Sequence, residues 1–253
     1  MRRTPRFSVF ASLALVFLVV PLARAEISHL AVSVDGLGCP FCVYGIEKKL
    51  KEVEGVRNVE TNLKAGLATL VLADGAAPDF GKVETAVKKA GFTPRNITLT
   101  AIGSPTIEEG KILFTVRGSG QRYLLYEKGS DSREVFDAAT QKQLTEWAEH
   151  GTLIAVTGTV HTHAEHPPGL STDRMEPLSF LTLTVEGMQC EQCAERLTRL
   201  LQETTGVYRA AVDVAKQRAT VESIGQTLDA APVIAVIEDA GFTATLSPGG
   251  TDQ

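Results

Sequence analysis

The chain has 253 residues, of which 43% are hydrophobic, so it is long enough to form more than one globular domain. It carries 25 lysines and arginines against 30 aspartates and glutamates, which gives a formal net charge of −5 at pH 7. This acidic balance argues against nucleic acid as a partner.

The first 25 residues have the pattern of a secretory signal peptide. Three arginines within the first six residues precede an apolar run at 9–22, and Ala23-Arg24-Ala25 provides a cleavage site. The apolar run is short for a membrane span, which favours a cleaved signal peptide; an uncleaved membrane anchor is the alternative. Cleavage would leave a chain with a formal charge of −9 in the periplasm or outside the cell, where unprotected thiols tend to be oxidised.

The next segment predicts a strand, a cysteine loop and a helix. Leu30, Val32 and Val34 alternate as in a half-buried strand at 28–34, and a helix is predicted at 41–53. Cys39 and Cys42 lie at the start of this helix, where unpaired N–H groups and the helix dipole favour thiolates. The spacing therefore predicts that the two sulfurs bind one soft metal ion. Further strands are predicted at 56–62, 67–72 and 92–99, and a second helix at 79–90.

Residues 102–175 predict a small β-rich domain. Gly103-Ser104-Pro105 and Pro167-Pro168-Gly169 are interpreted as linkers at its two ends. The glycine within Val156-Thr157-Gly158-Thr159-Val160 is similar to the glycine-bent strand of small OB-type barrels, so an OB-like form is expected. Strands are predicted at 111–117, 121–127 and 152–161, and a helix at 141–150.

Histidines gather where the last of these strands ends. On an extended chain His161 and His163 share a face, and with His166 or Glu165 they could form a weaker second site for Cu(II) or zinc. The alternative is a polar, solvated strand exit without a metal.

The second cysteine motif belongs to an internal repeat. Cys190 and Cys193 follow the first pair at an offset of 151 residues, and Ala90-Gly91-Phe92-Thr93 recurs as Ala240-Gly241-Phe242-Thr243. Each copy has the order strand, helix, strand, strand, helix, strand. This βαββαβ order predicts an α+β fold of two ferredoxin-like domains, in each of which two helices cover one face of an antiparallel sheet.

Gly187-Met188-Gln189-Cys190-Glu191-Gln192-Cys193 resembles the G-M-x-C-x-x-C signature of heavy-metal-associated domains. That family includes copper chaperones, periplasmic mercury-binding proteins and the N-terminal modules of metal-pumping ATPases. The resemblance implies that Cys190 and Cys193 are metal ligands, and that Cys39 and Cys42 are ligands in the first copy.

Two other positions are compared with the family. Leu37 stands where the family has the methionine represented here by Met188, a buried anchor of the loop, so this difference concerns loop rigidity more than binding. Phe92 and Phe242 hold the position where relatives place an aromatic residue or a lysine beside the metal loop. The alternative is that both rings are ordinary core residues.

The ligand set favours a soft ion over zinc. Structural zinc takes four ligands and catalytic zinc three, whereas each copy offers two sulfurs. Cu(I), Ag(I) and Hg(II) accept two thiolates, and the family resemblance together with export puts Cu(I) and Hg(II) first. The implied partners are the metal ion and a membrane metal transporter or another metal-binding protein.

Two other functions of the cysteine pairs remain open. A proline between cysteines, as at Pro40, also occurs in thiol-disulfide oxidoreductases, so a periplasmic redox protein is the alternative function. A structural disulfide within each pair is the third possibility.

Charge differs between the two copies. Residues 27–100 have a formal charge of +1, with three lysines at 48–51, whereas residues 179–247 have −4, with Glu191 and Glu195 beside the second cysteine pair. This difference suggests that the copies face each other transiently and exchange metal, or that each docks a different partner of opposite charge; two solvated helix faces are the alternative.

The sequence thus predicts an exported metal-binding protein rather than an enzyme, because no catalytic triad, phosphate loop or pump element is recognisable. The predicted organisation is a signal peptide at 1–25, metal-binding domains at 26–101 and 176–248, a β-rich insert at 102–175 and a disordered tail at 249–253.

Overall fold

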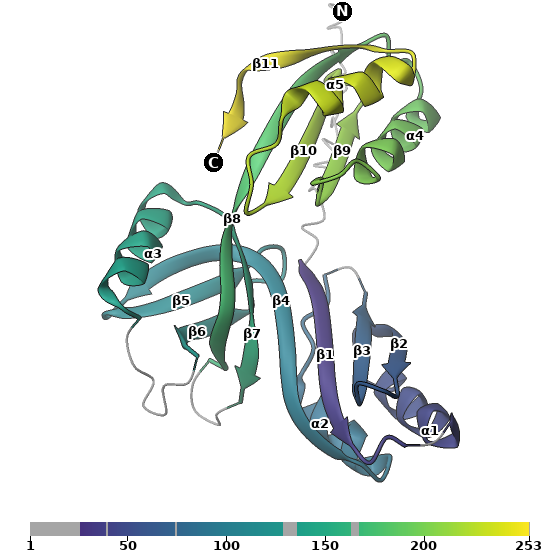
Figure 1. Ribbon diagram of the computed structural model, residues 1–253, viewed down its shortest axis with the longest axis vertical. Coiled ribbons are helices and arrows are strands. Elements are labelled where there is room, and N and C mark those ends of the chain that lie inside the picture. Colours follow the sequence, from purple (N-terminus) through teal and green to yellow (C-terminus); the bar gives the residue numbers. More distant parts are fainter. Residues whose placement is uncertain (1–25, 39, 74, 129–135, 163–166, 253) are drawn as a thin grey trace, which may run out of the picture.

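The computed structural model describes residues 26–38, 40–73, 75–128, 136–162 and 167–252 (Figure 1). The predicted signal peptide lies outside the described residues. Within the described part, no helix has the length and apolar character needed to cross a membrane.

The first module has the predicted βαββαβ order. Its sheet has the strand order β2-β3-β1-β4, with every neighbouring pair antiparallel, and both helices pack on it. The predicted element positions are confirmed to within two residues, except that the last strand runs far beyond residue 99. The elements are β1 (Ile27–Asp35), α1 (Pro40–Lys51), β2 (Val56–Asn62), β3 (Leu67–Leu72), α2 (Phe80–Lys89) and β4 (Thr93–Glu108).

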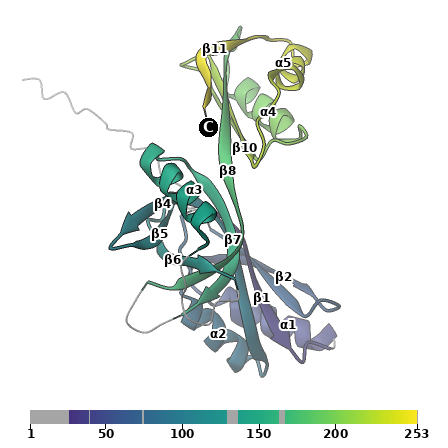
Figure 2. The same ribbon diagram turned by 60° about the vertical axis from the view of Figure 1, so that its left-hand side comes forward.

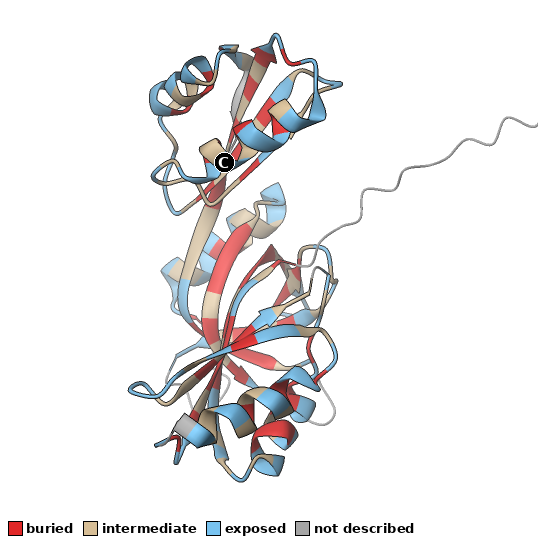
Figure 3. Ribbon diagram, turned by 90° about the vertical axis from the view of Figure 1, so that its right-hand side faces the viewer, coloured by how far each residue is buried: buried red, intermediate tan, exposed pale blue. Residues whose placement is uncertain are grey.

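Local chemistry explains the two helices of this module. In α1, Ile46 and Leu50 are fully buried against the sheet, and burial of each contributes about 2 kcal/mol. Helix α2 is capped by Asp79, whose side chain accepts a hydrogen bond from the Lys82 N–H at 3.1 Å. Figure 3 shows the outcome: buried residues concentrate along the strands, while the outer helix faces are exposed.

The middle segment forms a closed ring of strand pairings. β4 pairs with β5, β5 with β6, β6 with β8, β8 with β7, and β7 with β4. The β6–β8 pair is parallel and the others are antiparallel. The predicted hairpin, helix and strand are confirmed. The new elements are β5 (Lys111–Val116), β6 (Arg122–Glu127), α3 (Ala138–His150), β7 (Ile154–His161) and β8 (Gly169–Glu186).

The second module repeats the first, with the sheet order β9-β10-β8-β11. The prediction of a disordered tail at 249–253 is wrong for residues 249–252, because β11 continues past a bulge and pairs Thr251 with Leu181 and Asp252 with Phe180. The remaining elements are α4 (Glu191–Gln202), β9 (Arg209–Asp213), β10 (Arg218–Ile224), α5 (Ala230–Asp239) and β11 (Thr243–Asp252).

The modules share strands, and the predicted linkers and boundaries are therefore incorrect. Strand β4 leaves the first sheet and continues into the ring, so Gly103-Ser104-Pro105 lies inside a strand and pairs with β5. Strand β8 leaves the ring and becomes a central strand of the second sheet, so the expected boundary at 175/176 also falls inside a strand. Gly169, predicted as a linker residue, is the first residue of β8.

Gly103, interpreted as a linker residue, and Gly158, interpreted as bending its strand, are both places of close backbone approach. A Cβ atom at Gly103 would overlap the carbonyl group of Thr115, and one at Gly158 would overlap that of Ser171. The β7–β8 register shifts next to Gly158. These glycines allow strands to bend and cross closely rather than to move freely.

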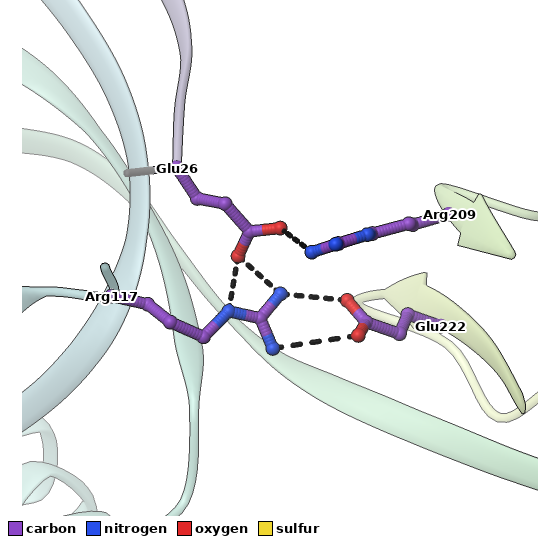
Figure 4. Close-up of polar contacts among 4 residues, drawn as sticks. All are labelled: Glu26, Arg117, Arg209 and Glu222. Carbon is purple, nitrogen blue, oxygen red and sulfur yellow. Dashed lines mark hydrogen bonds and ion pairs between the residues drawn. The ribbon is translucent and has the colours of Figure 1, made fainter. Parts of the chain in front are cut away.

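An ion-pair network ties the three parts together (Figure 4). Glu26, at the start of β1, contacts Arg117 of the ring and Arg209 of β9. Arg117 also contacts Glu222 of β10, with nitrogen and oxygen 2.8 Å apart. Burial lowers the pKa of Arg117, but hydrogen bonds and charge attraction from Glu26 and Glu222 outweigh burial and raise it above its ordinary value. Arg117 thus stays charged at neutral pH.

An apolar cluster beside this network completes the contact between the ring and the second module. Ile102, Ala155 and Leu178 are buried in it, and Phe180 and Tyr208 pack against them. The junction therefore has its own small core in addition to the shared strand β8.

We predict that Arg117→Gln lowers the free energy of unfolding by about 3 kcal/mol, because it leaves two largely buried carboxylates without their shared cation. Arg122→Gln is the matched control. It breaks the exposed Arg122–Glu108 pair, whose side chains are 41% and 53% exposed, and should cost about 0.5 kcal/mol. Urea denaturation of the full chain measures both, and equal losses would contradict the assigned role of the network.

We also predict that Gly103→Ala lowers the free energy of unfolding by about 2 kcal/mol, because the added methyl group meets main chain that is fixed in the β4–β5 ladder. Gly45→Ala, in α1, has no atom within 4 Å of the new Cβ and should be neutral or stabilising by about 1 kcal/mol. Thermal unfolding of both variants tests this contrast. An unchanged melting temperature in Gly103→Ala would show that the close approach of the two strands is not required.

Candidate metal centre

The second cysteine pair lies at the start of α4. Cys190 is the N-cap residue, with extended backbone angles of φ −142° and ψ 143°. Its Sγ accepts a hydrogen bond from the Cys193 N–H at 3.1 Å. The helix start therefore directs a backbone donor at a sulfur, as predicted for a site that favours the thiolate form.

The two sulfurs of this pair are close enough to be joined. Cys190 and Cys193 form a disulfide, with their Cα atoms 5.3 Å apart. Cys190 is exposed and Cys193 is half-buried. The structure thus holds the oxidised form of the pair, and reduction would free two adjacent sulfurs at the surface.

The loop before these cysteines is anchored by a buried side chain and by a hydrogen bond. Met188 is 3% exposed and packs into the core of the second module, as expected for the anchor position. Gln217, in the turn between β9 and β10, donates a side-chain hydrogen bond to the Met188 carbonyl oxygen at 2.8 Å. The sequence analysis missed Gln217, because a glutamine in a turn carries no motif; only the register between the turn and the loop reveals it.

The first cysteine pair is described in part. Cys42 lies in the first turn of α1, is half-buried and is disulfide-bonded, whereas Cys39 lies outside the described residues. Leu37 is 6% exposed and packs into the first core, so it occupies the anchor position as Met188 does in the second module. Leucine therefore provides apolar burial here, although it differs from the family's methionine.

Phe92 and Phe242 lie beside the two loops and also belong to the cores. Each ring is half-buried and packs against its module's apolar cluster. A Cβ atom placed on Gly36 would be 3.7 Å from the ring of Phe92, and one on Gly187 would be 3.9 Å from the ring of Phe242. Both interpretations of these residues are therefore compatible with their positions.

The outer faces of the two sites differ. Phe41 and Tyr44, next to Cys42, are 91% and 72% exposed. Their counterparts in the repeat are Gln192 and Glu195, which are also exposed. The first site is bordered by aromatic side chains and the second by polar and acidic ones.

The predicted histidine cluster is described only at His161. This residue is exposed at the end of β7, and its Nε2 lies 3.3 Å from the Ser171 Oγ. His163, Glu165 and His166 lie outside the described residues, so the second site for Cu(II) or zinc stays a prediction.

The two loops lie at opposite ends of the molecule, as Figures 1 and 2 both show for the starts of α1 and α4. The strand β4 starts beside the first loop, and β8 ends beside the second, with Thr93 paired to Asp35 and Glu186 leading into Gly187. Because β4, β7 and β8 are neighbours, about 60 Å of extended strand separates the two loops. In this arrangement the two loops of one chain do not face each other, so a transient encounter of the two copies stays a prediction.

Comparison with known proteins agrees with the repeated fold. The model of the family described as "Heavy-metal-associated domain" matches this chain twice, at residues 31–93 and 182–243. A Haemophilus influenzae protein of uncharacterised function is 38% identical over 68 residues, which are 27% of this chain and 98% of that protein. The chain belongs to the heavy-metal-associated domain family.

Larger relatives match across both copies. Human copper-transporting ATPase 2 is 22% identical over 215 residues, which cover 85% of this heavy-metal-associated protein but 13% of the ATPase. Copper-transporting ATPase 2 of Rhizobium meliloti is 28% identical over 209 residues, 83% of this chain and 15% of that protein. The crystal structure of a copper-binding domain from HMA7, a P-type ATPase, is 28% identical and covers 28% of this chain and 95% of its own, with a TM-score of 0.26.

Proposed function

We propose that each cysteine pair, once reduced, binds one soft metal ion, and that the protein delivers or sequesters that ion as a binding protein rather than an enzyme. The observation that carries this proposal is the geometry at α4, where adjacent sulfurs lie at an exposed helix start and the Cys193 N–H points at the Cys190 sulfur. An open site of two thiolates suits transfer, because an incoming thiolate can add before another leaves.

Cu(I) is the first choice of ion, and Hg(II) the second. Support for Cu(I) comes from the named relatives, which include copper-transporting ATPases of human and Rhizobium meliloti. Two-sulfur coordination suits both ions, so chemistry alone does not rank them. By the same reasoning, the proposed partner is a membrane metal transporter or another metal-binding protein.

We place the protein outside the cytoplasm, in the periplasm or secreted. Support comes from the arginines, apolar run and cleavage motif of residues 1–25. Export would expose the cysteines to oxidation, and the oxidised pair at Cys190 and Cys193 is consistent with such a compartment.

For the ring of strands between the two modules we propose an OB-type barrel. Support comes from its circular pairing order β4-β5-β6-β8-β7, from the parallel β6–β8 pair and from the position of α3 between β6 and β7. The glycine predicted to bend its strand, Gly158, lies next to a register shift in the β7–β8 pair.

A thiol-disulfide exchange function is the second candidate, because the Cys190–Cys193 disulfide is the form that an oxidant would carry. The two candidate functions predict different results in an insulin-reduction assay. With dithiothreitol as the electron donor that returns the Cys190–Cys193 disulfide to the dithiol, a redox protein should reduce insulin disulfides over many turnovers, whereas a metal-binding protein should not.

We predict that the reduced chain takes up one Cu(I) per cysteine pair and that the oxidised chain takes up none, because only thiolates ligate the ion. The Cys190→Ser/Cys193→Ser variant should lose one ion, as should Cys39→Ser/Cys42→Ser. Anaerobic titration against a coloured Cu(I) chelator measures the stoichiometry.

The matched control for this titration is Ser223→Ala, which removes a buried hydroxyl far from both loops and should leave the stoichiometry unchanged. Uptake by the chain lacking all four cysteines, or insulin reduction without metal uptake, would contradict the proposal.

We further predict that Cu(I) passes between the two sites only through a second chain or through solution, because about 60 Å of shared strand separates the loops. With half an equivalent of Cu(I), exchange between sites is followed by ¹H–¹⁵N spectra. Its rate should rise in proportion to protein concentration if the ion passes through a second chain, and exchange should be abolished by an excess of Cu(I) chelator if the ion passes through solution. Exchange whose rate is independent of protein concentration, and which continues in an excess of Cu(I) chelator, would instead show direct transfer within one chain.

A further inference from the structure

Gln217, in the turn between β9 and β10, makes three hydrogen bonds, one of which reaches the second metal loop. The backbone carbonyl of Gln217 accepts from the Val185 N–H at 2.8 Å. Its side-chain amide donates to the carbonyl oxygens of Met188 and Val214, each at 2.8 Å. The amide group thus bridges the turn to the residue two positions before Cys190.

The first module has the same turn without this bridge. Gly66 occupies the position of Gln217 at the repeat offset of 151, and both residues have positive φ, 62° and 49°. The Gly66 carbonyl oxygen accepts from the Val34 N–H at 2.7 Å, which repeats the backbone bond of Gln217. Glycine has no side chain to reach the Leu37 carbonyl, so the amide bridge that Gln217 makes in the second module cannot form from this turn position in the first.

The backbone conformation of Gln217 is energetically unfavourable for a residue with a side chain. A positive φ is unfavourable for a residue with a Cβ atom, and the glycine at the equivalent turn shows that the turn itself does not require a glutamine. The side-chain bridge is the feature that the glutamine adds.

We propose that Gln217 is a positioning residue that holds the second metal loop in its binding conformation and makes the second site the tighter of the two. The inference rests on the proposed function. A loop that is already fixed loses less conformational entropy when an ion binds, so both affinity and retention increase. The first site, without the bridge, then exchanges its ion faster.

The test is Gln217→Gly in the full chain, with the first site removed by Cys39→Ser/Cys42→Ser so that only the second site reports. We expect Cu(I) affinity at the second site to fall about fivefold, the factor that one net hydrogen bond provides. Chelator competition measures it. Because glycine accepts a positive φ, the fold should stay intact and global unfolding should not move towards lower stability.

Amide hydrogen exchange supplies a readout that needs no metal. In the Gln217→Gly chain, the amides of residues 187–190 should exchange faster, while those of residues 36–38 in the first loop should not change. Gln217→Asn, whose amide is one methylene shorter, should behave like the glycine variant. Lys216→Ala, which removes the surface contact with Asp213 in the same turn without adding backbone freedom, is the control and should leave both readouts unchanged.

Unchanged exchange at residues 187–190 and unchanged affinity in Gln217→Gly would overturn the inference. An equal loss of affinity at the first site, measured in the chain with Cys190→Ser/Cys193→Ser, would also overturn it, because the effect would then come from the whole fold. Failure of the unsubstituted chain to bind Cu(I) would contradict the proposed function alone, since the amide-exchange result stands without metal.

Discussion

The architecture depends on two strands that each belong to two modules. Strand β4 contributes its first part to the first sheet and its second to the ring, and β8 does the same for the ring and the second sheet. A strand whose backbone stays paired from one module into the next cannot act as a flexible linker, because bending it would break paired backbone groups. The ion network around Glu26 and Arg117 reinforces this connection, and the two cysteine loops are consequently held at opposite ends.

Much of the fold could be predicted from the sequence, because each copy is built from local patterns. The alternation at Leu30, Val32 and Val34 predicts β1, and the spacing of Ile46 and Leu50 predicts the buried face of α1. The repeat offset then transfers each assignment to the second copy. The cysteine pairs were found in the same way, since two thiols at a helix start need no distant residue to be recognised.

What could not be predicted depends on distant contacts. Gly103 was interpreted as a linker because glycine next to proline usually marks a turn, whereas here the missing side chain admits the backbone of β5. Arg117 pairs with Glu26 and Glu222, which are 91 and 105 residues away in sequence. Gln217 is 29 residues from Met188. No local sequence pattern indicates which of these residues are in contact.

The proposed function requires two independent sites of two sulfurs each. Their separation prevents four thiolates from gathering around one ion within a chain, which is how zinc would be held. X-ray absorption of the reduced chain loaded with Cu(I) tests this claim most directly. The account predicts two sulfur neighbours per copper and no copper–copper contact; nitrogen or oxygen ligands in place of sulfur, or a cluster of copper ions, would contradict it.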